Sequence, residues 1–449
     1  MIHPENLGNA QFKHVYGLRY AYLAGAMYKA IASIDLVVKL GKSNLMGYFG
    51  TGGLRLDKIE AAIDAIQNQL SSTQPYGMNL LCNLIKPDLE DETVALFLKK
   101  GIRNVEAAAY LQLTPSVVWF RLKGAKRIDN KIDVPHRILA KVSRPEVATA
   151  FMSPAPREMI QQLLQQGKIS AAEADCSQHI PIAHDICVES DSGGHTDQAT
   201  ALALIPAMQC LRHELQLKYA YTEAIYLGAA GGLGTPEALA AAFIMGADFV
   251  MTGSINQCSV EAGTSDAVKD ILQGINIQDT TYAPAGDMFE LGARVQVVRK
   301  GVLFPARANR LYELYKQHAG LDEIDEKITT QIQEKYFKKS FELVWAETKA
   351  YYLTEKPDEI EKAERQPRHK MALIFRWYFV HTTRLAMRGE ASVLDYQIHC
   401  GPALGAFNQS VKGTPLEDWR NRHVDEMAEK LMQETAQLLT QRYQQMGAR

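Results

Sequence analysis

Residues 182–197 read IAHDICVESDSGGHTD, a strand-like run that ends in a glycine-rich turn. The apolar part, Ile182 to Val188, is typical of a buried strand, and a helix-like segment begins near Gln198. Between them, Gly193 and Gly194 precede His195. Glycine lets the backbone come close to a ligand, and histidine is the side chain that best moves protons near neutral pH. Two more strand-then-glycine turns follow along the chain, and the set predicts a cofactor site.

The order of strands and helices predicts the fold. From about Tyr20 to Gln273, short apolar runs alternate with helical segments such as Leu56–Leu70, Asp88–Lys100 and Pro236–Met245. The expected strands are Tyr20–Ala24, Leu45–Phe49, Tyr76–Leu81, Asn104–Ala107, Ile138–Val142, Asp185–Val188, Ala224–Leu227 and Phe249–Thr252. This alternation indicates an α/β protein with a parallel sheet. Eight units predict a (β/α)8 TIM barrel, with an open doubly wound sheet as the alternative.

The remaining segments predict additions to the barrel. Extra helices are expected at about Ala155 to Cys176, between the fifth and sixth strands. We expect a barrel over residues 1–305, a helical lid or insertion subdomain over 306–390, and a C-terminal segment over 391–449 that packs back on the barrel. Two prolines in the polar segment Glu355–Lys370 suggest a linker or exposed turn, and an amphipathic helix is expected from Trp419 onward.

Composition excludes several classes of protein. The 449 residues carry a net charge of −2, which favours neither nucleic acid nor an anionic membrane as a partner. The apolar run Met371 to Val380 is too short to span a bilayer and contains Arg376, and the N-terminus lacks a signal pattern. None of the six cysteines forms a C-x-x-C pair, so no metal site is predicted. We expect a cytoplasmic protein.

Two glycine-rich turns predict a phosphate site. Residues 228–237 read GAAGGLGTPE, in which Thr235 is a good N-cap and Pro236 suits a first helical turn. The second turn is Thr252-Gly253-Ser254. In a barrel, the turns after the seventh and eighth strands commonly hold a phosphate. The alternative is that the glycines only make tight turns. Neither turn matches a P-loop or a Rossmann fingerprint, so the sequence does not favour a nucleotide hydrolase.

Three polar residues near strand ends are candidates for chemistry. His195 fits a proton donor, a neighbour of a flavin, or a buried structural histidine. Lys141 at the end of its strand is either solvated or, in a flavin site, a charge that stabilises the anionic reduced ring. The amide of Asn79 suits polar atoms of a flavin, or else stabilises a turn.

Together these motifs resemble a known family. The chain is similar to the superfamily of FMN-dependent nitronate monooxygenases and bacterial FMN enoyl reductases, and within it to the trans-acting enoyl reductases of polyketide synthases and of polyunsaturated fatty acid synthases. The resemblance covers nearly the whole chain. It rests on the segments 24–29 (AGAMYK), 47–53 (GYFGTGG), 140–147 (AKVSRPEV), 191–197 (DSGGHTD), 231–236 (GGLGTP), 250–257 (VMTGSINQ), 375–378 (FRWY) and 395–403 (DYQIHCGPA).

The resemblance implies FMN as the cofactor and gives each matching residue a role. Those expected to contact the flavin ring or ribityl chain are Gly25, Ala26, Met27, Asn79, Lys141 and Glu189. Those expected around the phosphate end are Gly193, Gly194, Gly231, Gly232, Gly253 and Ser254. His195 is implied to lie beside the ring as proton donor, with Lys141 as the second catalytic residue. Here Gly-Ala-Met replaces the usual Ala-Pro-Met of the superfamily, which weakens the transfer of contacts at residues 25–27.

The resemblance also implies a reaction and a partner. NADPH, or NADH, would reduce FMN, and the reduced flavin would reduce an enoyl thioester carried by an acyl carrier protein. The helices after about Ala306 would help to dock the carrier, or would instead form a packing or homodimer element. A nitronate monooxygenase-type oxidase, an enoyl reductase of a polyunsaturated fatty acid synthase and a non-catalytic scaffold are the alternatives.

Overall fold

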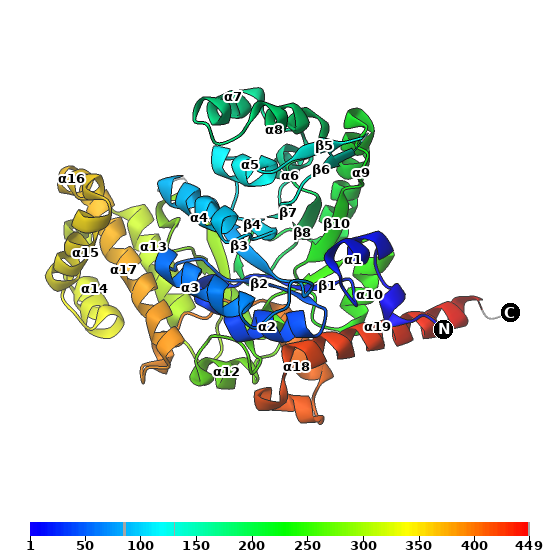
Figure 1. Ribbon diagram of the computed structural model, residues 1–449. Helices are drawn as coiled ribbons and strands as arrows, with labels where there is room; N and C mark the ends of the chain where they lie inside the picture. The colour runs from blue at the N-terminus through cyan, green and yellow to red at the C-terminus, as the bar shows by residue number, and fades with distance from the viewer. Residues whose placement is uncertain (84–86, 130, 448–449) are drawn as a thin grey trace. The chain divides into compact units, whose positions relative to one another are not determined.

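A computed structural model describes residues 1–83, 87–129 and 131–447 (Figure 1). The chain forms two compact units. Unit 1 contains Met1–Asp191, Asp197–Gly263 and Gln409–Arg449, and unit 2 contains Ser192–Thr196 and Thr264–Asn408.

Unit 1 is built on a closed barrel of eight parallel strands. Around the barrel the strand order is β1-β11-β10-β8-β7-β4-β3-β2. The strands are β1 (Tyr22–Ala24), β2 (Met46–Phe49), β3 (Gly77–Leu81), β4 (Asn104–Ala108), β7 (Arg137–Val142), β8 (Asp185–Glu189), β10 (Tyr226–Ala230) and β11 (Val250–Thr252). All eight expected strands are confirmed, and closure excludes the open doubly wound sheet. Because the strands are parallel, their carboxyl ends meet at one rim, where barrel enzymes place their active sites.

Helices surround this barrel. They are α1 (Ala10–Tyr16), α2 (Ile34–Lys42), α3 (Leu56–Gln67), α4 (Pro87–Lys99), α5 (Pro115–Leu122), α6 (Pro145–Met152), α7 (Arg157–Gln165), α8 (Ala171–Cys176), α9 (Ala201–Tyr219), α10 (Pro236–Ile244), α11 (Ser254–Gln257) and α19 (Val424–Gly447). Local sequence explains several helix starts. Thr235 accepts a hydrogen bond from the amide of Ala238 and Pro236 opens α10, as expected.

Helices α7 and α8 form the expected insertion between β7 and β8. A polar antiparallel hairpin, β5 (Lys126–Ile128) and β6 (Lys131–Asp133), lies before β7. The expected C-terminal helix begins at Val424 rather than at Trp419, which lies in a short 3-10 turn. Its Asp425 accepts a hydrogen bond from Ser43 (2.9 Å), so the helix packs against the barrel's outer helices.

Unit 2 combines a small sheet with a helical bundle. The sheet is antiparallel in the order β12 (Thr280–Pro284), β13 (Arg294–Val298), β9 (Gly194–His195). The helices are α12 (Asp266–Leu272), α13 (Phe304–Gln317), α14 (Glu326–Gln331), a π-helix (Ile332–Phe337), α15 (Phe341–Glu355), α16 (Pro357–Arg365), α17 (Pro367–Arg388) and α18 (Pro402–Ser410), which leads back to unit 1.

One sequence-based expectation in unit 2 is wrong. Glu355–Lys370 is not a linker, because α16 and α17 occupy most of it. Pro357 and Pro367 each stand in the first helical turn, where the missing N–H has no intrahelical partner to lose. The structure groups β12 and β13 with the helices of unit 2. Their inward side chains, Ala283, Val295 and Val297, share a core with Phe375 of α17.

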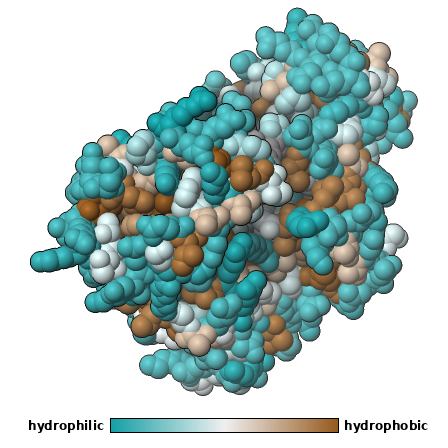
Figure 2. All heavy atoms as spheres, turned by 90° about the vertical axis from the view of Figure 1, so that its left-hand side faces the viewer, coloured by the Kyte–Doolittle hydropathy of each residue, from teal (hydrophilic) through white to brown (hydrophobic). Residues whose placement is uncertain are grey.

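Figure 2 shows a largely hydrophilic surface with separate hydrophobic patches. Among the described residues, no helix is both long and apolar enough to cross a membrane.

Candidate active site

A largely buried lysine and two carboxylates meet inside the barrel of unit 1. Lys141 lies two residues after Leu139 on β7, so both side chains share one face of the strand. Leu139 belongs to an apolar cluster that draws side chains from six of the eight strands and fills the barrel interior. The Nζ atom of Lys141 lies 3.1 Å from Oε1 of Glu106 and 3.6 Å from Oε1 of Glu189. These residues come from the adjacent strands β4, β7 and β8.

The electrostatics keep Lys141 charged. Burial by itself lowers the pKa of the Lys141 ammonium, but the carboxylates of Glu106 and Glu189 raise it by more, and the net pKa lies above the ordinary value for lysine. Glu106 is wholly buried, so its carboxylate needs this cation as compensation. The ammonium of Lys141 therefore stays protonated near the carboxyl rim of the barrel, where it offsets the charge of one of the two carboxylates.

Glu106 also fixes the turn after β1. Its Oε2 accepts a hydrogen bond from the backbone amide of Ala26 (2.8 Å), within the predicted Gly25-Ala26-Met27 segment. A Cβ atom on Gly25 would lie only 3.0 Å from Sδ of Met251, so a larger residue there would crowd the turn. The turn is thus held by a carboxylate and closely packed.

Asn79 forms hydrogen bonds within the wall of the barrel. Its Nδ2 donates to the backbone oxygen of Glu106 (3.0 Å), and its own backbone oxygen accepts from Thr51 (2.9 Å). The side-chain amide nitrogen of Asn79 therefore links β3 to β4 and has a structural role.

The predicted glycine turns lie at the ends of neighbouring strands. Gly231 and Gly232 follow β10, while Gly253 and Ser254 follow β11. Both glycines after β10 have positive φ angles, +87° and +74°. A Cβ atom on Gly231 would lie 2.5 Å from the carbonyl oxygen of Ser190, whereas one on Gly232 or Gly253 would have no atom within 4 Å.

This arrangement fits the phosphate end of a flavin. Gly232 and Gly253 border open space beside adjacent parallel strands, and two turns there present backbone rather than side chains. The Oγ atom of Ser190 is buried without a hydrogen-bond partner among the described residues, and Ser190 lies against Gly231. A phosphate oxygen is the kind of partner that such a hydroxyl can donate to. In the described part of the chain, no cluster of three or more His, Cys, Asp or Glu residues is placed to hold a metal ion.

The other predicted residues, Gly193, Gly194 and His195, lie in unit 2. Gly194 and His195 form β9, which pairs with Val295 and Gln296 of β13. The Nε2 atom of His195 lies 2.9 Å from Oδ1 of Asp287. Partial desolvation raises the pKa of Asp287, whose side chain is 60% exposed, but the hydrogen bond and positive charge of His195 lower it by more, so the net pKa is below the ordinary value. Asp287 is therefore an ionised acceptor, and Nε2 of His195 carries a proton.

A second histidine stands near His195. His399 bridges to Val297 of β13, and its Nε2 lies 2.8 Å from the side-chain nitrogen of Gln397. Burial lowers the pKa of His399 to about 4, with a further contribution from the charge of His195 and opposition from Asp287. Neutral His399 accepts the hydrogen bond that the Gln397 amide donates. Unit 2 thus contains one histidine bonded to a carboxylate and one kept neutral.

Burial of neutral His399 predicts a pH dependence of stability. Its pKa is lower in the folded chain than the ordinary value of 6.5, so the folded state binds fewer protons than the unfolded state between these values. The contribution of His399 to the free energy of unfolding is therefore fully present above about pH 6.5 and is lost as the pH falls toward 4. The loss is on the order of 3 kcal/mol. Urea unfolding of the wild type and of His399→Gln at pH 7.5, 6 and 5 measures it. Parallel pH profiles for the two proteins would contradict the assignment.

Sequence reasoning missed three residues of these sites. Glu106 could have been found, because a carboxylate inside the apolar strand Asn104–Ala108 requires a buried partner. His399 lies within the segment 395–403 that carries the resemblance, although no role is assigned to it there. Asp287 has no local signal, since only the tertiary structure brings it to His195.

Comparisons with known proteins agree with this fold and these motifs. A family model described as the inserted helical domain of [acyl-carrier-protein] S-malonyltransferase matches residues 318–396. The chain is 56% identical over 447 residues to the polyketide biosynthesis protein PksE of Bacillus subtilis and 53% identical over 447 residues to ThaF of Burkholderia thailandensis. These alignments cover 99% of this chain but only 58% and 38% of the two relatives, so the chain spans part of their length.

Solved structures extend the comparison. FabK from Thermotoga maritima shares the fold, with a TM-score of 0.57 and 16% identity over 96% of this chain and 97% of that one. The enoyl reductase domain of MlnA, from the macrolactin cluster of Bacillus amyloliquefaciens, superposes with a TM-score of 0.95. It is 44% identical, and the match covers 98% of this chain and 99% of that domain. Because the match spans nearly the whole of both chains at this identity, the chain belongs to the enoyl reductase family of polyketide synthases.

Proposed function

We propose that the chain is an FMN-dependent enoyl reductase that acts in trans on enoyl thioesters of an acyl carrier protein in polyketide biosynthesis. The observation that carries the proposal is the 44% identity to the MlnA enoyl reductase domain over almost the entire chain. The buried cation and the glycine turns at the barrel rim are consistent with a flavin. The helical segment 318–396 matches a family named for an acyl-carrier-protein transferase, which supports a carrier-bound substrate.

Unit 1 provides the groups that would hold FMN. The turns at Gly231-Gly232 and Gly253-Ser254 would accommodate its phosphate, while Gly25, Ala26, Met27 and Glu189 would approach its ring and ribityl chain. The chemistry that FMN supplies when bound is hydride transfer from a reduced nicotinamide, NADPH or NADH, to the β-carbon of the enoyl thioester. Lys141 would keep a protonated ammonium in the site, and the carboxylates of Glu106 and Glu189 would partly offset its attraction for negative charge on the cofactor.

Unit 2 provides the proposed proton donor. Reduction at the β-carbon leaves the α-carbon in need of a proton, and we assign this proton to the imidazolium of His195. Asp287 favours the charged imidazole, because its ionised carboxylate accepts from Nε2 at 2.9 Å.

A spectrum of the purified protein under anaerobic conditions tests the function. We expect a flavin absorption band that bleaches when NADPH is added and returns when a crotonyl thioester follows. A band that bleaches with a nitronate and ignores NADPH would assign the protein to the oxidase class. Absence of bound flavin after reconstitution with FMN would overturn the proposal.

Replacing His195 with alanine is expected to separate the two half-reactions. Reduction of the thioester should slow by about 100-fold, the usual contribution of a positioned acid, because the α-carbon loses its proton donor. Reduction of the flavin by NADPH should change much less, since it requires no such proton. Stopped-flow absorbance measures both rates. Equal slowing of the two half-reactions, or of neither, would remove His195 from this role.

A further inference from the structure

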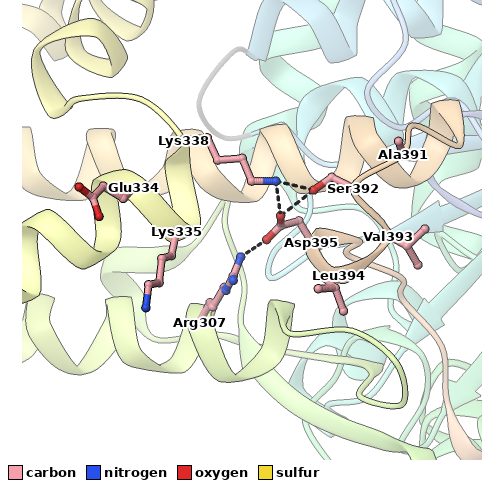
Figure 3. Close-up of a pocket in the computed structure, with 9 residues that line it drawn as sticks. All are labelled: Arg307, Glu334, Lys335, Lys338, Ala391, Ser392, Val393, Leu394 and Asp395. Carbon is pink, nitrogen blue, oxygen red and sulfur yellow. Dashed lines mark hydrogen bonds and ion pairs between the residues drawn. The ribbon is translucent and has the colours of Figure 1, made fainter.

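Unit 2 contains a cation-lined pocket apart from the residues assigned to catalysis. The pocket has a volume of about 410 Å³. It is shown in Figure 3 and is lined by Arg307, Glu334, Lys335, Lys338, Ala391, Ser392, Val393, Leu394 and Asp395. We refer to these nine residues as the cation pocket. Arg307 comes from α13, the next three from the π-helix and the residue after it, and the last five from the turn after α17.

Asp395 organises the cation pocket. Its carboxylate forms an ion pair with Arg307, lies 3.3 Å from Nζ of Lys338, and accepts hydrogen bonds from Ser392 (2.9 Å) and Tyr378 (3.3 Å). Nζ of Lys338 also donates to Oγ of Ser392 (2.7 Å). This buried carboxylate therefore fixes two cations that come from different elements, and it opens the segment 395–403 that carries the family resemblance.

The pocket keeps an excess of positive charge. Three cations and two carboxylates line it, which leaves a net charge of +1. Lys335 has no carboxylate partner among the described residues, and in Figure 3 the carboxylate of Glu334 points away from the Arg307–Asp395 pair. Both Lys335 and Lys338 are exposed. An acidic partner can therefore reach Lys335 directly, and Lys338 beside its existing ion pair with Asp395.

The backbone beneath these lysines is unusual. Residues Ile332–Phe337 form a π-helix, a rare conformation that occurs often at functional sites. It ends at Lys338, which has a positive φ of 53° and is not a glycine. Such a conformation costs free energy and persists where the surrounding structure imposes it. Here the ion pair with Asp395 holds Lys338 at the pocket.

Apolar side chains border the cations. Val393 and Leu394 line the pocket with exposed fractions of 38% and 57%. Exposed aliphatic groups beside lysines match a partner surface that presents acidic residues around an apolar centre. A free small anion would not make use of these aliphatic groups.

We propose that the cation pocket is the docking point for acidic side chains of the acyl carrier protein. The proposal rests on the proposed function, because it names the surface that receives the carrier of the substrate. The match to the inserted helical domain of an acyl-carrier-protein transferase supports the proposal independently of the charges. The matched residues, 318–396, contain eight of the nine pocket residues. Docking at these lysines would orient the carrier, while its thioester is reduced elsewhere.

Charge reversal tests the docking surface. The variants are Lys335→Glu and Lys338→Glu, and the matched control is Lys362→Glu on α16, which changes an exposed lysine of unit 2 outside the pocket. For a crotonyl thioester on a polyketide-synthase carrier protein, KM should rise about tenfold in each pocket variant, the equivalent of about 1.4 kcal/mol. With free crotonyl pantetheine, KM and kcat should equal those of the wild type. The effect on carrier-bound substrate should shrink at high salt, where exposed charges are screened.

A second measurement separates acidic side chains from the phosphodiester of the carrier's pantetheine arm. The carrier without its arm should inhibit reduction of the carrier-bound substrate about as well as the carrier with a free arm. Inhibition that requires the arm would overturn docking through acidic side chains. Unchanged KM values for carrier-bound substrate in both pocket variants, or an equal rise in the Lys362→Glu control, would also overturn it. If the wild type reduced neither substrate, the proposed function itself would fail, which is a distinct outcome.

Discussion

Replacing Lys141 with methionine is expected to lower the free energy of unfolding by about 3 kcal/mol at pH 7.5. The variant keeps most of the length of the side chain but leaves the wholly buried carboxylate of Glu106 without its cation at 3.1 Å. Removal of one partner of a buried pair costs more than the pair contributed, because a desolvated charge remains. Urea denaturation followed by circular dichroism measures the loss.

The partner carboxylate provides the control for this loss. The double variant Lys141→Met, Glu106→Gln should be more stable at pH 7.5 than the single variant, because it buries an uncharged amide. A double variant no more stable than Lys141→Met would show that the pair is not coupled.

Replacing Gly231 with alanine is expected to destabilise unit 1 by about 3 kcal/mol, from a positive φ that costs alanine about 1 kcal/mol and from a steric overlap that costs about 2. The overlap arises because the new methyl group would lie 2.5 Å from the carbonyl oxygen of Ser190. Gly232→Ala is the matched control, since its φ is also positive but no atom lies within 4 Å. It should cost only about 1 kcal/mol. Equal losses in the two variants would contradict the close approach to Ser190.

The same loops test where a flavin phosphate would lie. Gly253→Ala should change stability little, because Gly253 has a φ of −131° and its Cβ would meet open space. If the phosphate occupies that space, the affinity for FMN should fall at least tenfold, or by about 1.4 kcal/mol. Fluorescence titration of the apoprotein with FMN measures this affinity. Wild-type affinity in Gly253→Ala would place the phosphate elsewhere.

The local sequence pattern is sufficient to predict the barrel strands but not to predict all of the helices in the C-terminal part of the chain. The strand Asp185–Glu189 is recognisable because a short apolar run ends in polar residues and glycine, and β1, β2, β10 and β11 also run directly into glycine. In the segment 355–370, the two prolines predict a linker or exposed turn, whereas the structure has helices there. The effect of proline on a helix depends on its position. In the interior of a helix proline breaks or kinks it, whereas in the first turn proline is well tolerated. Which meaning applies to Pro357 and Pro367 depends on the packing of α16 and α17.

The sequence by itself determined the eight-stranded barrel, the position of Lys141 near a strand end and the glycine turns after β10 and β11, because strand alternation and turn chemistry are local properties. Only the tertiary structure decided which charges meet. Lys141 pairs with Glu106 because β4 and β7 are neighbours in the closed barrel. His195 contacts Asp287, which lies 92 residues further along the chain. The cation pocket likewise joins α13, the π-helix and the turn after α17 around Asp395. Such contacts depend on register and packing between distant segments, which no local pattern encodes.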